Sequence, residues 1–99
     1  MRLSPDQIQA IKQTAYAVLG AESRVILFGS RVDDAKKGGD IDLLFEVDHP
    51  LESRVAATGA LYAALIRKLG DRKIDILVKD SATPPAPVLD IARQTGIQL

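Results

Sequence analysis

The feature that most constrains the fold is a run of four apolar residues, Val25-Ile26-Leu27-Phe28, which Gly29-Ser30 brings to an end. The run is short, continuous and rich in β-prone side chains. Because successive side chains of a strand point to opposite sides of the sheet, such a run predicts a strand that is buried on both faces. We therefore predict a strand from Arg24 to Phe28.

Two more strands follow from alternating polarity. The segment Asp40 to Val47 alternates so that one face is apolar, carried by Ile41, Leu43 and Phe45. The segment Lys73 to Val78 alternates in the same way, with Ile74, Ile76 and Val78 on one side. This period of two predicts strands with one face toward a core. The polar segment 31–39 between the first two strands is predicted to be a loop.

Three helices are expected around these strands. The first begins at Ser4-Pro5-Asp6-Gln7, where Ser4 and Gln7 form a capping box, and it ends before Gly20. The second covers roughly 51–69 and stops at Gly70. We predict that its buried side carries the following residues: Val55, Thr58, Tyr62, Leu65, Ile66 and Leu69. A short third helix is expected from about Pro87 to Gln94.

The order of these elements predicts an α/β (α+β) fold, with a small mixed β-sheet and helices on one face. The second face is then either open or covered by something outside this chain. At 99 residues the chain has the size of one domain, residues 1–99, in which 81–99 form a proline-rich loop and a C-terminal helix.

Composition excludes several classes of function. Thirteen Lys and Arg balance thirteen Asp and Glu, so the chain lacks the net basic charge that binding of duplex nucleic acid requires. The same balance favours association, as a homo- or hetero-oligomer. No cysteine is present for disulfides or thiolate chemistry, and the single histidine, His49, is predicted to be a solvent-exposed turn residue. We expect no membrane segment and a cytoplasmic location.

Three carboxylates stand where strands normally avoid charge. Asp40 and Asp42 begin one predicted strand, and Asp75 interrupts the apolar run of another. Two like charges separated by one residue lie on the same sheet face and repel, and a divalent cation such as Mg²⁺ between them removes the repulsion. A third carboxylate from a neighbouring strand makes room for two metal ions.

The glycine-serine turn supplies the complement to these acids. Glycine lets the backbone approach a phosphate closely, and the Ser30 hydroxyl donates to phosphate oxygens. Three cations of the next segment, Arg31, Lys36 and Lys37, neutralise a triphosphate. Taken singly, each feature is typical of ordinary structure: a turn, a solvated strand edge or an isolated structural aspartate. Their combination on successive strands predicts nucleotidyl transfer.

The sequence also resembles a known family. Leu27-Phe28-Gly29-Ser30-Arg31, followed by Asp40-Ile41-Asp42-Leu43-Leu44, is similar to the signature of the minimal nucleotidyltransferases of the polymerase-β superfamily. The likeness covers nearly the whole chain. It implies a polymerase-β-like nucleotidyltransferase fold, with ATP as substrate held at Gly29 and Ser30. It further implies two Mg²⁺ ions at Asp40, Asp42 and Asp75, with Asp75 also helping to activate the acceptor hydroxyl.

Members of this family are often paired with a HEPN-domain toxin. The resemblance therefore implies an antitoxin that transfers AMP to a tyrosine of a HEPN ribonuclease and forms a complex with it. Two departures leave an alternative open. Nine residues separate Ser30 from Asp40 where ten are usual, with Gly39 in place of a serine, and the usual glycine in the middle of the loop is absent. Asp33 and Asp34 also add negative charge to the loop. The alternative is a catalytically degenerate antitoxin that neutralises its toxin by binding alone.

Overall fold

The computed structural model describes residues 3–29, 41–70 and 73–99. Within these ranges the chain forms three helices and four strands. In chain order they are α1 (Pro5–Leu19), β1 (Arg24–Phe28), β2 (Ile41–Glu46), α2 (Arg54–Leu69), β3 (Ile74–Lys79), α3 (Pro87–Thr95) and β4 (Ile97–Gln98). The three predicted strands and three predicted helices are therefore present, with bounds that differ by at most a few residues. The predicted loop 31–39 lies outside the described residues.

The four strands form one sheet in the order β3-β2-β1-β4. β2 pairs with β1 in antiparallel fashion and with β3 in parallel, so the predicted mixed sheet is confirmed. β4 was not predicted. It contributes only two residues, which pair with Ile26 and Leu27. A strand of two residues is too short to show an alternating pattern in the sequence.

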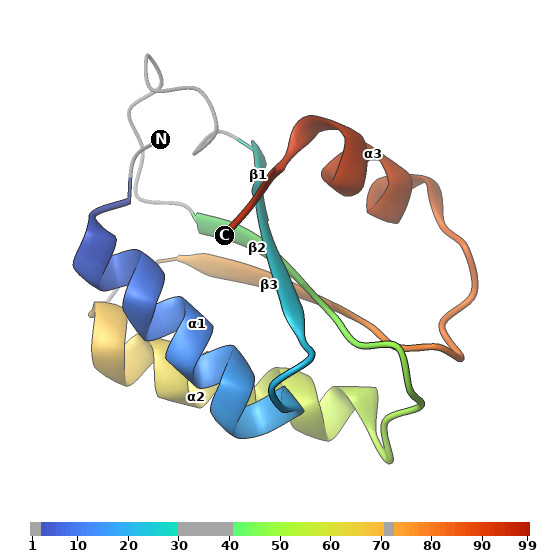
Figure 1. The fold of residues 1–99 in the computed structure, drawn as a ribbon, viewed down its shortest axis with the longest axis horizontal. Coiled ribbons are helices and arrows are strands. Elements are labelled where there is room, and N and C mark those ends of the chain that lie inside the picture. The colour runs from blue at the N-terminus through green and yellow to red at the C-terminus, as the bar shows by residue number, and fades with distance from the viewer. Residues whose placement is uncertain (1–2, 30–40, 71–72) are drawn as a thin grey trace.

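One face of the sheet is covered by α1 and α2, which lie side by side beneath it in Figure 1. Val25 and Leu27 of β1 pack on this side, together with the apolar positions of the other two long strands. The fully buried members of this cluster from the sheet and helices are Ile11, Leu27, Ile41, Leu43, Phe45, Leu61 and Leu65. Burial of these side chains, each contributing about 1.5–3 kcal/mol, fixes which face of each strand is the core face.

The other face is covered in part by α3, which lies across the sheet from α1 and α2 (Figure 1). Leu89 and Ala92 of this helix pack on Ile26 and Leu44. We expected helices on one face only, with the second face open or covered from outside the chain. That expectation is wrong where α3 covers β1 and β2. The physical reason lies in β1: a strand that is apolar on both faces needs a cover on both, and α3 supplies the second one.

The buried side of α2 also differs from the prediction. The helix packs through a row spaced four residues apart, namely Ala57, Leu61, Leu65 and Leu69. Val55 and Tyr62, which were expected to be buried, are 84% and 46% exposed. The predicted set mixed two sides of the helix: Leu65, Ile66 and Leu69 pack in the core as predicted, whereas Val55 and Tyr62 lie on a neighbouring side that the core does not cover.

The helix ends follow their sequence signals. Ser4 Oγ accepts from the backbone N–H of Gln7, and the Gln7 side chain accepts from the backbone N–H of Ser4, which confirms the predicted capping box. Gly20 and Gly70 end α1 and α2, both with positive φ. His49 is exposed, as predicted. Across the parts of the chain that the structure describes, no helix has the length and apolarity needed to cross a membrane.

Candidate active site

Three residues on three neighbouring strands form a row across the sheet. The register pairs Phe28 of β1 with Asp42 of β2, and Asp42 with Asp75 of β3. Partners in adjacent strands stand about 4.8 Å apart and share one face of the sheet. The structure therefore brings Asp42 and Asp75, two residues 33 positions apart in the sequence, side by side.

The two carboxylates lie on the face opposite α1 and α2. Alternation along the strands shows this, because Leu44 and Leu77 occupy the same faces as Asp42 and Asp75 and pack in the cluster beneath α3. Asp42 is half-buried and Asp75 is exposed. The pair thus sits on the α3 side of the sheet, near the ends where β2 and β3 begin.

Gly29 adjoins this pair at the end of β1. Its φ of +76° is a backbone conformation that favours glycine. A Cβ added at this position would overlap the carboxylate of Asp42. Any other residue would therefore displace the Asp42 side chain. Glycine is needed at this position for two reasons: its positive φ and the space beside Asp42.

This arrangement fits a divalent cation. Two neighbouring carboxylates repel each other unless positive charge lies between them, and their oxygens are the donors that Mg²⁺ prefers. Because Gly29 has no side chain, the space beside the Asp42 carboxylate that a Cβ would fill stays open. Among the described ranges no group of three His, Cys, Asp or Glu residues gathers to hold a metal ion. The third predicted carboxylate, Asp40, lies outside those ranges.

The other residues predicted for the nucleotide also fall outside the described part of the chain. They are Ser30, Arg31, Lys36 and Lys37. Their roles stay predictions. Gly29, Asp42 and Asp75 are the predicted site residues that the structure positions, and it brings all three to one corner of the sheet.

Beside Asp75 lies a hollow that the sequence did not point out. It has a volume of about 480 Å³ and runs between β3 and α2. Its walls are mostly apolar and come from Val55, Thr58, Gly59, Tyr62, Ile74, Asp75 and Ile76. A signal was present in Gly59, whose lack of a side chain in the middle of a helix marks a place where α2 leaves open space.

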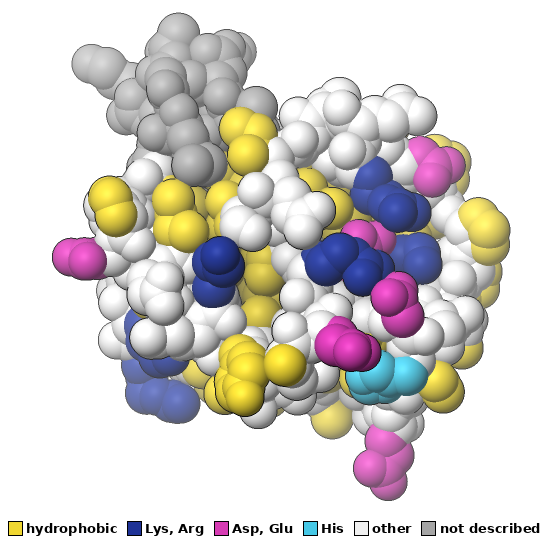
Figure 2. Space-filling view, viewed as in Figure 1, with side chains coloured by type: hydrophobic (Ala, Val, Ile, Leu, Met, Phe, Trp, Pro, Cys, Tyr) yellow, Lys and Arg dark blue, Asp and Glu magenta, His cyan; other side chains and the backbone are white. Residues whose placement is uncertain are grey.

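The opposite ends of β1 and β2 hold a different set of charges. Glu46 is 2% exposed and lies 3.6 Å from Arg24 Nε and 3.4 Å from Arg93 Nε. Arg24 also donates two hydrogen bonds to Asp48, at 2.9 and 3.1 Å, and these bonds lower the pKa of the Asp48 carboxyl. Figure 2 shows basic and acidic side chains gathered on the half of the molecule that holds α3. Glu46 and Asp48 thus both have arginine partners within the chain.

Asp80, at the end of β3, is likewise a structural acid. Its carboxylate accepts from the backbone N–H groups of Leu51 and Ala82 and from the Thr83 hydroxyl. The hydrogen bond from Leu51, followed by that from Thr83, lowers the pKa of Asp80. These bonds fasten the turn after β3 to the segment that leads into α2.

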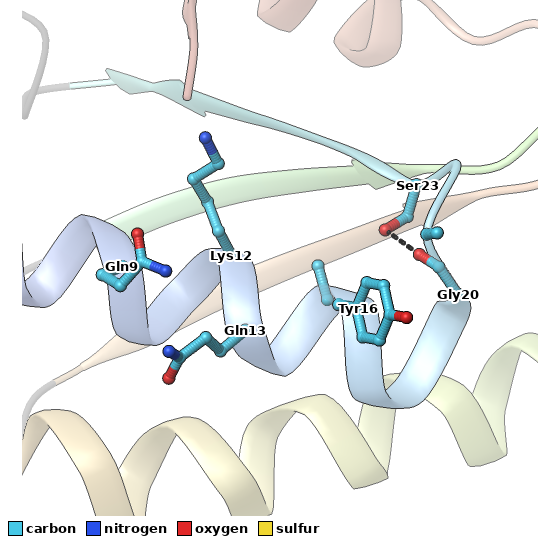
Figure 3. Close-up of a pocket in the computed structure, with 8 residues that line it drawn as sticks. Gln9, Lys12, Gln13, Tyr16, Gly20 and Ser23 are labelled. Atoms are coloured by element: carbon cyan, nitrogen blue, oxygen red, sulfur yellow. Dashed lines mark hydrogen bonds between the residues drawn. The ribbon is translucent and has the colours of Figure 1, made fainter.

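A second hollow, of about 290 Å³, lies along α1 and is shown in Figure 3. Gln9, Lys12, Gln13 and Tyr16 line it from successive turns of the helix, and the Ser23 hydroxyl closes one end by donating to the Gly20 carbonyl at 2.8 Å. Tyr16 is 65% exposed. None of the predicted site residues lines this hollow.

Comparison with known families agrees with the site. The family model described as the nucleotidyltransferase domain matches residues 8–94. The chain therefore belongs to the nucleotidyltransferase domain family, within the polymerase-β superfamily, and its activity is nucleotidyl transfer. Domains of this family commonly use a nucleoside triphosphate and a divalent metal ion. No curated protein matches the chain.

Proposed function

We propose that this chain is a minimal nucleotidyltransferase that transfers AMP from ATP to a tyrosine of a HEPN-domain ribonuclease toxin, and so acts as its antitoxin. One domain, residues 1–99, carries the activity. The observation that supports the transfer site most directly is the placement of Asp42 beside Asp75, with the Asp42 carboxylate against Gly29. The family supplies the reaction class.

The roles of the residues follow from their chemistry. Asp40, Asp42 and Asp75 would hold Mg²⁺, which neutralises the triphosphate and steadies the leaving phosphate when it is bound. Gly29 lets the backbone approach the phosphates, and the Ser30 hydroxyl donates to them. Arg31, Lys36 and Lys37 add positive charge along the triphosphate.

The transfer itself is a substitution at phosphorus. The tyrosine oxygen forms a bond to the α-phosphorus of ATP, and the bond from that phosphorus to the oxygen bridging the α- and β-phosphates breaks. Pyrophosphate leaves. The phenol proton passes to the carboxylate of Asp75, which is exposed and so within reach of an acceptor that comes from another protein.

The position of Asp75 supports a macromolecular acceptor. β3 is the last strand of the sheet, and the described residues place no further element beyond it. Among the described residues the site is therefore open on the side of Asp75, and an acceptor protein would complete it from there.

The test is to incubate the purified chain with the HEPN ribonuclease proposed as its partner, ATP and Mg²⁺, and to measure intact masses. A gain equal to one or more AMP groups on the HEPN protein is expected, together with loss of its ribonuclease activity. Asp40→Ala and Asp42→Ala should remove the mass gain while the chain still folds. Neutralisation of the ribonuclease that survives both substitutions, with no mass gain, would show instead that the chain acts by binding alone.

A further inference from the structure

The outer edge of β3 has the features of a site for an added strand. β3 ends the sheet order β3-β2-β1-β4, and within the ranges 3–29, 41–70 and 73–99 no strand pairs with its outer side. Within these ranges the backbone N–H and C=O groups on that side therefore have no strand partner and can bond to an extended peptide. A free edge of this kind is one of the recurring modes by which proteins bind peptides.

A groove follows the same edge. The hollow beside Asp75 adjoins another of about 500 Å³, and the two share Val55, Thr58 and Ile76. Together they follow β3 from Ile74 to Val78 on the α2 side. Val55 and Tyr62, two apolar side chains that the core does not cover, stand over this groove.

An extended polypeptide suits these two features together. Its backbone bonds to the strand edge, while every second side chain enters the groove, because side chains of a strand alternate between faces. A helix or a flat protein surface would fill the groove and leave the edge groups unbonded. The groove lies on the α2 face of the sheet and the proposed transfer site on the α3 face, and the two meet at Asp75 of the edge strand.

We propose that the acceptor polypeptide binds to the outer edge of β3 as a fifth strand, with its tyrosine opposite Asp75. This inference rests on the proposed function. The residue opposite Asp75 extends the row formed by Phe28, Asp42 and Asp75, so it lies on the face of the carboxylates. The residues directly before and after the tyrosine then point into the groove on the other face.

The proposal specifies the acceptor sequence as an extended segment of the form apolar-Tyr-apolar. Its first test compares two synthetic peptides, one with Thr-Val-Tyr-Val-Thr and one with Thr-Asp-Tyr-Asp-Thr at the centre, as acceptors of AMP. We expect the valine peptide to have a kcat/KM about tenfold higher or more, because only it fills the groove. Equal rates for the two peptides would overturn the proposal.

Strand pairing is tested with the valine peptide methylated on its backbone nitrogens. In one version the methylated backbone nitrogens are those of the tyrosine and of every second residue on either side of it. In the other version they are those of the remaining residues, including both valines. Only alternate N–H groups of an added strand face its partner. We expect one version to lose about tenfold in kcat/KM per lost hydrogen bond, and the other to keep most of its activity. Equal losses, or none, would contradict strand addition.

The protein side of the groove is tested with Gly59→Gln and its matched control Ala63→Gln. A side chain at position 59 enters open space at the groove, and Ala63 is an exposed residue one turn further along α2 that does not line it. Gly59→Gln should raise the KM for the valine peptide about tenfold and change kcat less than twofold, whereas Ala63→Gln should change neither. Equal effects of both variants would overturn the proposal.

The outcomes separate this inference from the proposed function. Transfer of AMP to the HEPN protein, combined with peptides that show no sequence or methylation preference, removes the added strand and keeps the function. Absence of transfer to any tyrosine removes both. A third outcome is that the chain forms a dimer, that the valine peptide dissociates this dimer, and that no AMP is transferred to the peptide. The edge of β3 would then bind a second copy of the chain, and the proposal would be overturned.

Discussion

The two ends of β2 treat a carboxylate in opposite ways. Asp42 and Glu46 lie four residues apart on the same face of this strand. At one end Glu46 is almost fully buried and has guanidinium groups of Arg24 and Arg93 within 3.6 Å. At the other end Asp42 stands beside a second carboxylate, Asp75, in the neighbouring strand.

The difference shows which charges serve the fold and which serve the chemistry. A buried acid that is paired within the chain ties elements together, here β1, β2 and α3 through Glu46. Asp42 and Asp75 are like charges on neighbouring strands, and a cation between them would lower their mutual repulsion. The binding of metal and nucleotide proposed above would account for such a pair. Variants at the two ends should therefore have opposite effects.

The largest expected effect is on the rate of transfer. Asp42→Asn should lower kcat for AMP transfer about 10²- to 10³-fold or more, because the amide keeps the shape of the side chain and removes its charge. Glu46→Gln, at the same face of the same strand, should leave kcat within about threefold and lower the free energy of unfolding instead. The measurements are pyrophosphate release and urea denaturation. Similar rate losses in both variants would show that the two ends are not functionally distinct.

The second effect is at Gly29, and it tests the space beside Asp42. Gly29→Ala should lower kcat about tenfold to 100-fold and destabilise the fold by about 1–3 kcal/mol, since the new Cβ overlaps the Asp42 carboxylate and the backbone has a positive φ. Gly59→Ala is the control, because a Cβ there meets nothing within 4 Å. That variant should stabilise α2 by up to about 1 kcal/mol. A Gly29→Ala enzyme with normal activity would mean that Asp42 has no fixed position in catalysis.

The strands, and the faces on which their side chains lie, could be predicted from the sequence, because a half-buried strand alternates apolar and polar residues. The alternation in 40–47 and 73–78 predicted which faces carry Asp42 and Asp75, and the structure agrees. The pairing of these two residues could not be derived in the same way. It depends on a parallel register between β2 and β3, which is set by how α2 packs and not by any local pattern.

The groove and the second face were missed for a related reason. Hydrophobic side chains such as Val55 and Tyr62 are expected in a core, and only the way in which α2 packs on the sheet shows that they lie outside it. Likewise α3 has an apolar side formed by Leu89 and Ala92, but the sequence does not say which face of the sheet it meets. Both depend on tertiary packing, which propensity alone does not determine.

The third effect is on stability at the paired end. Arg93→Ala should lower the free energy of unfolding by about 1–2 kcal/mol, because it leaves the buried Glu46 with Arg24 alone and loosens α3. The value is moderate because the Arg93 side chain is 52% exposed and water partly replaces it. Arg67→Ala, at an exposed position near the end of α2, should change stability by less than about 0.5 kcal/mol. Urea denaturation at neutral pH gives both values. Equal effects of the two variants would show that the Arg93–Glu46 ion pair does not hold α3 on the sheet.

The smallest effect has the opposite sign and concerns the metal-free protein. Asp75→Asn removes one of two neighbouring like charges, so in EDTA it should raise the free energy of unfolding by a few tenths of a kcal/mol. Millimolar Mg²⁺ with ATP should then stabilise the wild type more than the variant, because ligand that binds the native state alone shifts the equilibrium toward it. Thermal melts with and without the ligands give both differences. If Asp75→Asn lowers the melting temperature in EDTA, Asp75 is a structural acid like Glu46, and the contrast between the two ends of the sheet disappears.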